Sequence, residues 1–504
     1  MTAETGLLNA AVTGVVTGSI VALGATGLAL VYDIAEVPNF AHGDLLTLGA
    51  YTALLVNKPD TVPIFNLLVP GAQQHGVAGG AVLFVLSVAS VLGIVYHLGG
   101  VRALKGSWWG IDPPDVLALG VHGAVAAAVG AIVVLGAPDF LASILFAFVV
   151  LGAVVPVLES VVFRTFREKD VELALMLVVS LAVAFIVRFG IQTIFGGEIR
   201  FYTIETTFPF AGGQLDISLA KFVDFFVVNE GLLVGIRDTR GETADLLLAL
   251  SYSWIELAVV VAATVAAAYA AHRWRRDAAG VVGPRLAAAL AGIATLGLGA
   301  ALLCGGAGGT LPESGIISTR IRISPLRIGI ILLALVMMSA LHYLLQATTL
   351  GKAMRATSDN RQLAMVRGIN TRQVMMSVWI ISGLFAAIGG VMLGFLFSSI
   401  EINLGFNLLL AMFAGVILGG ISVYGAILGS YVVGLAMEIG IFAIPGLSAT
   451  YRIPVAFVVR LLVLLVKPEG IVGGSLHAGL RRRDIVHSHG VGRCPPHPRS
   501  DHVR

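Results

Sequence analysis

Charged residues are scarce in this chain. Aspartate, glutamate, lysine and arginine make up only 12% of its 504 residues, whereas hydrophobic residues make up 57%. A soluble domain carries about 25% charged residues, so this composition excludes an ordinary soluble fold. The formal net charge of +3 is also too small to indicate a nucleic-acid partner. The composition predicts an integral, multi-pass protein of the cell membrane.

Cysteines and catalytic motifs are also rare. The two cysteines, Cys304 and Cys494, give no disulfide framework and no zinc-ligand spacing. The chain contains no GxxxxGK[ST] phosphate-binding loop and no HExxH or GxSxG motif. We therefore expect a chain that is not an enzyme, with no catalytic residues, no metal site and no cofactor of its own.

Long apolar segments, in contrast, are frequent. Because lipid offers the backbone no hydrogen bonds, only helices or closed barrels span a membrane, and we predict an all-α, polytopic transmembrane helical protein. Two segments, 408–421 and 453–467, are shorter than the ~20 residues of a full span, and 408–421 either spans or is re-entrant. The thirteen predicted segments are 7–31, 40–57, 77–98, 116–136, 139–163, 171–195, 246–271, 285–304, 326–346, 374–398, 408–421, 425–445 and 453–467.

Basic residues in the loops indicate the orientation. The loop 349–372 contains Lys352, Arg355, Arg361, Arg367 and Arg372. The positive-inside rule places such a loop in the cytoplasm. The basic loops 164–170 and 272–285 and the arginine-rich tail then fall on the same side. We therefore predict that the N-terminus lies outside and the C-terminus in the cytoplasm.

The loop 349–372 is also predicted to be structured. Asp359 and Gln362 have the spacing of a capping box, which starts a short helix, and Gly368 followed by Ile369 is typical of a helix end. A short basic helix at the cytoplasmic face is suited to docking a soluble partner. Physical reasoning alone leaves a topogenic loop without any partner equally open.

Pro38 interrupts the first apolar region, because proline cannot sit inside an unbroken helix without cost. Asn39 is then the expected N-cap of the next helix, with Asp44 in its first turns, where the helix dipole favours an anion. Two interpretations remain open. This stretch is either a cap and turn near the cytoplasmic boundary, or a place where Asn39 and His42 line a translocation path.

Four ionisable residues fall inside the predicted spans, where a charge is costly and usually faces a partner or a cavity. They are Arg188, Glu256, Glu438 and Arg460. Glu438 and Arg460 lie on neighbouring segments, so the sequence allows a buried pair between them. We therefore count Glu438, with Asn39, His42 and Asp44, among the candidate residues of a translocation path.

Small residues recur at spacings of four near the C-terminus, in Gly415-x3-Gly419 and Gly425-x3-Gly429. Such spacing lets helix backbones approach closely. The glycines either pack helices within one subunit or form a face against a second membrane subunit.

Several stretches together resemble the branched-chain amino acid ABC transporter permease family. They are GLALVYDIAEVPNFAHGDLLTLGAY at 27–51, the loop 348–370 with LGKAMRA and GIN, the C-terminal part 408–435 with VLLVKPEGIVG at 463–473, and a weaker match at 158–170. The resemblance implies a permease that works as a pair of membrane subunits with two cytoplasmic ATPases and an extracytoplasmic substrate-binding protein. ATP and magnesium would be bound by the ATPase.

The resemblance also implies a role for the basic loop. This loop would be the element that couples to the ATPase, and its candidate residues are Gly351, Lys352, Arg355, Asp359, Asn360, Arg361 and Gly368. The second permease would be a related chain or another copy of this one.

The family-like core covers residues 1–58, 139–212 and 323–474, within a permease domain of 1–474. Two inserts, at about 60–138 and 213–320, each contain two further hydrophobic segments. We expect two hairpins at the lipid-facing periphery of a core of about nine segments. Residues 475–504 are expected to form a disordered cytoplasmic tail, in which metal binding by histidines is left open.

The sequence therefore predicts the membrane permease subunit of an ATP-binding-cassette importer, which forms the translocation path for branched-chain amino acids or similar small polar solutes. Urea and short amides are alternative substrates within the same resemblance. An ion-coupled secondary transporter is the rival from another class, and the lack of a coherent acidic ion site argues against it. The exact substrate, the partner permease and the role of the inserts stay open.

Overall fold

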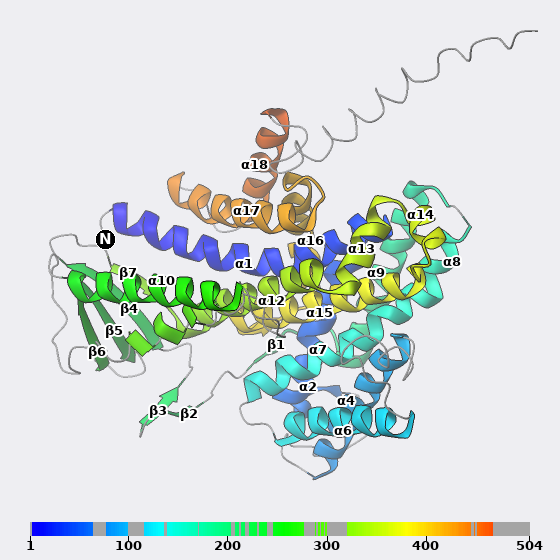
Figure 1. Ribbon diagram of the computed structural model, residues 1–504, viewed down its shortest axis with the longest axis horizontal. Helices are drawn as coiled ribbons and strands as arrows, with labels where there is room; N and C mark the ends of the chain where they lie inside the picture. Colours follow the sequence, from blue (N-terminus) through cyan, green and yellow to red (C-terminus); the bar gives the residue numbers. More distant parts are fainter. Residues whose placement is uncertain are drawn as a thin grey trace, which may run out of the picture.

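The computed structural model of this protein is mainly helical (Figure 1). It describes residues 3–63, 77–98, 115–135, 139–169, 171–202, 207–210, 213–216, 221–228, 231–238, 245–276, 288, 291–292, 294–296, 298–299, 320–444, 448 and 451–466. Within these residues, eight helices are long and apolar enough to cross a membrane. The chain is thus a polytopic membrane protein, while the count of thirteen segments and their orientation stay predictions.

The helices follow the apolar segments closely. The longer ones are α1 Ala3–Ala35, α2 Ala41–Asn57, α4 Val77–His97, α6 Asp115–Leu135, α7 Asp139–Leu158, α9 Leu173–Phe195, α10 Trp254–Arg276, α12 Pro325–Ala347, α15 Thr371–Phe397, α16 Leu404–Leu418, α17 Val423–Ala443 and α18 Arg452–Val466. The shorter ones are η1 Pro59–Thr61, η2 Glu159–Phe163, α8 Arg164–Arg167, α13 Thr349–Asp359 and α14 Arg361–Val366. Of the segment 285–304, eight residues are described and all are helical.

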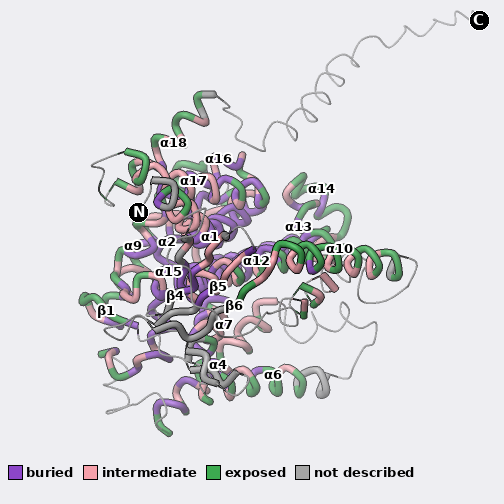
Figure 2. The backbone as a smooth tube through the Cα atoms, turned by 90° about the vertical axis from the view of Figure 1, so that its left-hand side faces the viewer, coloured by how far each residue is buried: buried purple, intermediate pink, exposed green. Residues whose placement is uncertain are grey.

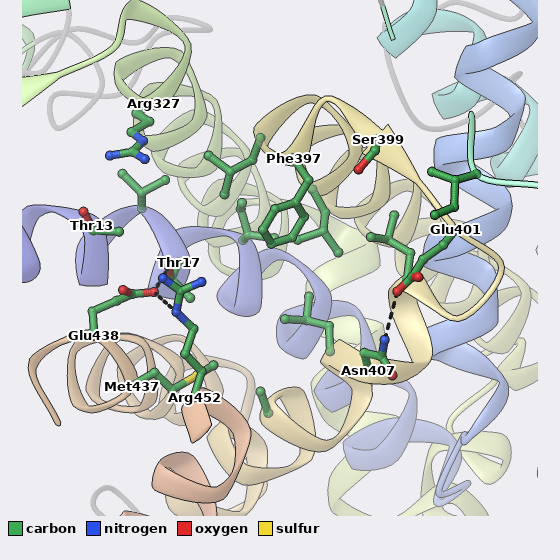
Figure 3. A pocket seen from close by; sticks show the side chains of 18 residues that line it. Thr13, Thr17, Arg327, Phe397, Ser399, Glu401, Asn407, Met437, Glu438 and Arg452 are labelled. Carbon is green, nitrogen blue, oxygen red and sulfur yellow. Dashed lines mark hydrogen bonds and ion pairs between the residues drawn. The ribbon is translucent and has the colours of Figure 1, made fainter. Parts of the chain in front are cut away.

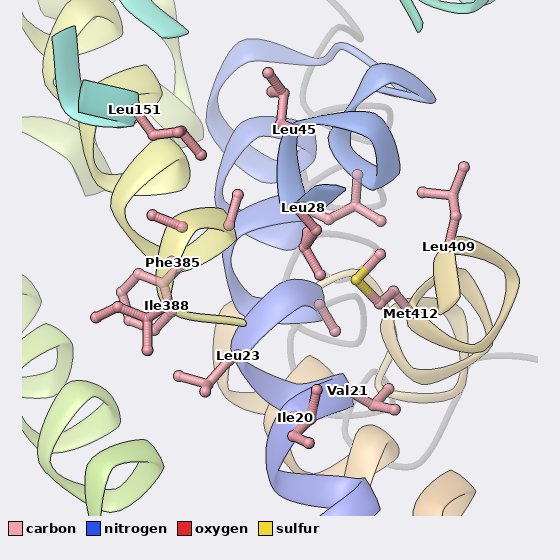
Figure 4. Packing of buried hydrophobic residues seen from close by; sticks show 14 of the residues in the cluster. Ile20, Val21, Leu23, Leu28, Leu45, Leu151, Phe385, Ile388, Leu409 and Met412 are labelled. Atoms are coloured by element: carbon pink, nitrogen blue, oxygen red, sulfur yellow. The ribbon is translucent and has the colours of Figure 1, made fainter. Parts of the chain in front are cut away.

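Helices α1 and α15 form the centre of the molecule. Helix α1 packs against α17, α15, α16 and α12, and α15 packs against α7 and α2 as well. Nearly nine tenths of the residues in the most apolar stretch of α1 are buried. Figure 2 shows that buried residues gather along these helices. Leu23 of α1, Phe385 of α15 and Met412 of α16 lie together in this core (Figure 4). Burial of such apolar side chains holds the helices in one arrangement.

Glycines set how closely these helices approach. A Cβ atom on Gly405 of α16 would collide with the backbone carbonyl of Gly43 on α2. In the same way, Gly419 packs on Gly425, and Gly429 packs on Gly415. The glycines of the two small-residue repeats therefore pack α16 against α17 within this subunit, which was the first of the two interpretations.

The described parts of the two inserts lie outside this centre. Helix α4 packs against α6 and α7 and shares with them a small second core that includes Leu83, Val133 and Phe146. Helix α10 is mostly exposed along its length (Figure 2), and only 6% of the residues in its most apolar stretch are buried. The division into a core and two peripheral hairpins stays a prediction. The predicted disordered tail lies outside the described residues.

The prediction of an all-α protein is wrong for the second insert, which contains β-strands. The strands β4 Lys221–Val228, β5 Gly231–Asp238, β6 Asp245–Ser253 and β7 Arg320–Ile323 form an antiparallel sheet in the order β6-β5-β4-β7. Two smaller pairs join β1 Arg200–Phe201 to β8 Ser399–Ile400, and β2 Thr207–Phe210 to β3 Gly213–Asp216. Figure 1 shows the four-stranded sheet and the helices α13 and α14 at opposite ends of the molecule.

The helix predicted from residue 246 begins at Trp254 instead. A short apolar run does not distinguish a strand from a helix, and residues 245–253 pair with β5. The switch to helix occurs at a capping box. The Ser253 hydroxyl accepts a hydrogen bond from the Glu256 amide (3.2 Å), and the Glu256 carboxylate accepts one from the Ser253 amide (2.8 Å). Glu256, which the sequence placed within a span, thus starts the helix.

Candidate functional sites: a polar cavity and a basic helical loop

A cavity of about 580 Å³ opens between helices α1, α12, α15, α16, α17 and α18 (Figure 3). It lies near the start of α1 and α12 and the end of α15, and therefore at the end of the bundle opposite the loop 349–372. Much of its wall is apolar: Val16, Ile20, Leu393, Leu396, Leu404 and Leu408. Four ionisable side chains and several hydroxyl and amide groups complete the lining. They make it suitable for a small molecule with both polar and apolar parts.

Glu438 of α17 lines this cavity and is 9% exposed. Its Oε1 accepts a hydrogen bond from the Thr17 hydroxyl (3.1 Å) and lies 3.3 Å from Nε of Arg452 on α18. Glu438 therefore pairs with Arg452 and not with Arg460, the pair that the sequence allowed. Helices α17 and α18 follow each other closely in the chain, so the start of α18 meets the end of α17. Arg460 lies two turns further on and lines another cavity, of about 410 Å³.

Two further ionisable residues of the cavity were missed by the sequence interpretation. Arg327 is in the first turn of α12, whose N-cap Ser324 accepts a hydrogen bond from the Arg327 amide (3.3 Å). Glu401 precedes α16 and accepts a hydrogen bond from the Asn407 side-chain amide (3.2 Å). A basic residue at the edge of the apolar segment 326–346 was the available signal for Arg327. Glu401 lies in a turn and gave no signal.

The prediction that Asn39 caps α2 is wrong. The residue at the N-cap position is Phe40, which has helical backbone angles (φ −69°, ψ −23°) and donates its amide hydrogen to Ser180 Oγ (3.1 Å). Because the turn has become helical by Phe40, the Asn39 side chain points into the protein instead. It is completely buried, and neither atom of its amide has a hydrogen-bond partner among the described residues.

His42 connects three helices. Its Nε2 lies 2.9 Å from the carbonyl oxygen of Gly24 on α1, and its Nδ1 lies 3.5 Å from the hydroxyl of Ser382 on α15. Asp44, two residues later on α2, forms an ion pair with Arg188 of α9. Asn39, His42 and Asp44 are fully buried and do not line the cavity next to Glu438. Their role in a translocation path stays a prediction.

Helix α13 forms the first half of the basic loop. The hydroxyl of Thr348 caps it by accepting a hydrogen bond from the Gly351 amide (3.0 Å). A Cβ atom on Gly351 would collide with the carbonyl oxygens of Leu344 and Leu345, so only glycine allows this close reversal after α12. Gly351, Met354 and Thr357 are buried, while Lys352 and Arg355 on the other face are exposed. The helix is therefore amphipathic, with its cations toward solvent.

Helix α14 forms the second half, and its cap differs from the prediction. Helix α13 continues through Asp359, so the break comes one residue later and Asn360, not Asp359, caps α14 by accepting from the Leu363 amide (2.9 Å). The predicted glycine end is confirmed. Gly368 has φ +81°, and the amides of Gly368 and Ile369 donate to Met365 and Ala364 (both 3.0 Å), which is a Schellman motif.

The loop is attached to the membrane helices by polar contacts. The Ser358 hydroxyl donates to the backbone carbonyl (3.2 Å) and the carboxylate (3.3 Å) of Asp33 at the end of α1. The Arg355 guanidinium donates to Gln346 of α12 (2.7 Å). Partial burial lowers the pKa of Arg361, and the nearby Arg167 cation lowers it further, against an opposing effect of Glu159. The hydrogen bonds of Ser358 and Arg355 thus connect the loop to the ends of α1 and α12.

The outer surface of α14 combines cations with exposed apolar side chains. Leu363, Met365 and Val366 are 56%, 49% and 84% exposed, and they stand between Arg361 and Arg367. Exposed apolar groups surrounded by charge mark a surface for a protein partner. Within the described part of the chain, no group of three histidine, cysteine or acidic side chains could hold a metal ion.

Comparison with known proteins identifies a matching family. A family described as the permease component of the branched-chain amino acid transport system matches residues 10–97 and 241–466. These two ranges include most of α1, all of α2 and both halves of the basic loop. No solved structure matches the chain.

Individual relatives match shorter stretches. The high-affinity branched-chain amino acid transport system permease protein LivH of Escherichia coli is 35% identical over 137 residues, which are 27% of this chain and 44% of LivH. The corresponding protein BraD of Pseudomonas aeruginosa is 32% identical over 152 residues, 30% of this chain and 48% of BraD. The autoinducer 2 import system permease protein LsrC of Shigella flexneri is 25% identical over 295 residues, 56% of this chain and 84% of LsrC. The chain thus spans less than half of the length of LivH and BraD.

Proposed function

The chain belongs to the branched-chain amino acid transport permease family, and from this premise we propose that it is the membrane permease subunit of an ATP-binding-cassette importer. It is a multi-pass transport subunit of the membrane rather than an enzyme. Its substrate is a branched-chain amino acid, in keeping with the names of LivH and BraD. The relative LsrC makes autoinducer 2 the main alternative, and urea and short amides are further alternatives.

The basic loop supplies the coupling to ATP. Helices α13 and α14 present exposed cations and apolar side chains on one surface, while their other side is attached to α1 and α12. A cytoplasmic ATPase that docks on this surface would move the membrane helices when it binds and hydrolyses ATP. The coupling residues that we propose are Gly351, Lys352, Arg355, Asp359, Asn360, Arg361 and Gly368. This arrangement is the observation that carries the proposal.

The cavity beside Glu438 is the outward part of the translocation path. It lies at the end of the bundle away from the loop, which is the extracytoplasmic end if the loop is cytoplasmic. A substrate-binding protein on that side would deliver the solute into it. His42 and Asp44 lie deeper, where they connect α2 to α1, α15 and α9, and they act on the path through these helices.

The complete importer contains more chains than this one. We propose two ATPases, which bind the ATP and magnesium, a second permease that is a related chain or another copy, and an extracytoplasmic binding protein. In this chain the family-like core is accompanied by the two inserted hairpins at its periphery, with the N-terminus outside and the C-terminus in the cytoplasm.

Purification of the tagged chain from its native membranes tests this function. The solubilised complex is analysed for bound proteins and then reconstituted in vesicles with leucine and ATP. Recovery of an ATPase and a second permease, with leucine uptake that requires ATP, is the expected result. Recovery of the chain alone, with uptake that follows a sodium or proton gradient, would instead establish a secondary transporter. If the complex takes up autoinducer 2, urea or acetamide but not leucine, the transported compound is the substrate in place of a branched-chain amino acid.

A further inference from the structure

One end of the cavity collects most of its charge. Figure 3 shows Thr13, Thr17, Arg327, Glu438 and Arg452 on one side, and Glu401 with Asn407 on the other. The first group comes from four helices, α1, α12, α17 and α18, so it depends on the tertiary fold. It contains two cations and one anion. One positive charge is therefore in excess at this end of the cavity.

Arg327 provides the unpaired cation. Among the described residues, its guanidinium has neither an ion-pair nor a hydrogen-bond partner. It also lies in the first turn of α12, where the helix dipole disfavours a positive charge. A cation at the edge of an apolar span is costly and usually faces a partner or a polar cavity. Arg327 can therefore pair with an anionic group of a ligand in the cavity.

Glu438 provides a carboxylate of which only one oxygen is engaged by described residues. Arg452 lies 3.3 Å from its Oε1, and the Thr17 hydroxyl donates to the same oxygen. Its Oε2 has no hydrogen-bond partner among the described residues. Glu438 can therefore accept a hydrogen bond from a cationic group.

The remaining lining is apolar and lies next to these groups. Leu393 and Leu396 of α15 and Leu404 and Leu408 of α16 contribute to the same cavity. Its volume of about 580 Å³ is ample for one amino acid with water around it. The charged groups suit a small polar head group, while the leucines offer a surface for an aliphatic side chain.

We propose that this cavity binds a zwitterionic α-amino acid with an aliphatic side chain, with its carboxylate on Arg327 and its ammonium on Glu438. Thr17 and Arg452 hold the Glu438 carboxylate in place. This inference rests on the proposed function and adds the residues that bind the two charged groups of the substrate and its orientation in the cavity. A neutral solute such as urea or a sugar would leave Arg327 without an anionic partner, and a site built for a charged group discriminates against a ligand that lacks it.

Binding of radiolabelled leucine to the purified complex, without the substrate-binding protein, tests the proposal. Leucinamide, which lacks the carboxylate, and 4-methylpentanoate, which lacks the ammonium, serve as competitors. The wild-type complex should prefer leucine over each analogue by at least ten-fold. In Arg327→Gln the preference over leucinamide should disappear, and in Glu438→Gln the preference over 4-methylpentanoate should disappear.

Matched controls separate this effect from general damage. Arg273→Gln on the exposed face of α10 and Glu198→Gln before β1 should keep both preferences. Arg327→Lys should retain part of the preference over leucinamide because it retains the charge. Since Glu438 takes part in helix contacts, the half-exposed Arg327 decides the question if Glu438→Gln fails to fold.

The outcomes also separate the two proposals. If the wild-type complex takes up no leucine with ATP, the proposed function fails for leucine. If it takes up leucine but Arg327→Gln still prefers leucine over leucinamide, only the orientation in the cavity is wrong.

Discussion

Asp44 of α2 and Arg188 of α9 form a bidentate ion pair between two helices. The Arg188 Nε lies 2.8 Å from Asp44 Oδ1, and its Nη2 lies 3.1 Å from Oδ2. The Asp44 side chain is fully buried and that of Arg188 is 14% exposed. The guanidinium also lies over the ring of Phe406 on α16, 4.3 Å from its centroid. These contacts fix the position of α9 relative to α2 and α16.

Removal of one member of this pair should destabilise the protein. We expect Asp44→Asn to cost about 3–5 kcal/mol, because it leaves the Arg188 charge in an apolar environment without compensation. The thermal unfolding of the detergent-solubilised protein, followed by fluorescence-detected gel filtration, measures this. The double variant Asp44→Leu with Arg188→Met should recover most of the loss. An unfolding temperature of Asp44→Asn equal to that of the wild type would show that the pair does not stabilise the fold.

Reversal of charge on the loop should release the ATPase. We expect Arg355→Glu with Arg361→Glu to abolish co-purification of the ATPase, because both exposed cations belong to the proposed docking surface. The second permease should stay bound. Arg273→Glu on the exposed face of α10 is the control and should retain both partners. Undiminished recovery of the ATPase with the double variant would rule out this docking surface.

The two glycines of the loop should differ in sensitivity. A Cβ at Gly351 collides with backbone carbonyls, so Gly351→Ala must displace α13 from α12. A Cβ at Gly368 meets nothing within 4 Å, so Gly368→Ala only strains the left-handed backbone, at a cost of about 1 kcal/mol. We expect loss of ATPase recovery with Gly351→Ala and only a few-fold loss with Gly368→Ala. If both variants lost the ATPase to the same extent, the close reversal between α12 and α13 would not be a requirement for ATPase binding.

Replacement of Asn39 should affect the stability of the protein and its transport activity differently. Its buried amide has no hydrogen-bond partner among the described residues, and such a group costs about 1–3 kcal/mol. Asn39→Leu, of similar size, should therefore unfold at an equal or higher temperature. Leucine uptake should fall if Asn39 serves the translocation path. A stable variant with normal uptake would instead assign Asn39 to the turn after Pro38 alone.

Local signals in the sequence predicted much of the fold correctly. Long apolar runs marked the helices, since lipid leaves the backbone no alternative. Gly368 and Ile369 predicted the end of α14, because a Schellman motif depends only on neighbouring residues. The apolar run after residue 245 was misassigned to helix because its pairing with β5 is not local. Asp359 was misassigned as a cap because α13 was longer by one residue than the pattern indicated.

By itself, the sequence determined that this is a helical membrane protein of the branched-chain amino acid permease type, with a basic, structured loop between two spans. The tertiary structure decided which charges meet. Glu438 contacts Arg452 rather than Arg460, and Asp44 contacts Arg188, while Arg327 lines the cavity without a partner among the described residues. The physical reason is that the apolar content of a helix and the hydrogen bonds that cap it depend on residues close together in the sequence. The partner of a buried charge depends instead on the rotation and approach of whole helices.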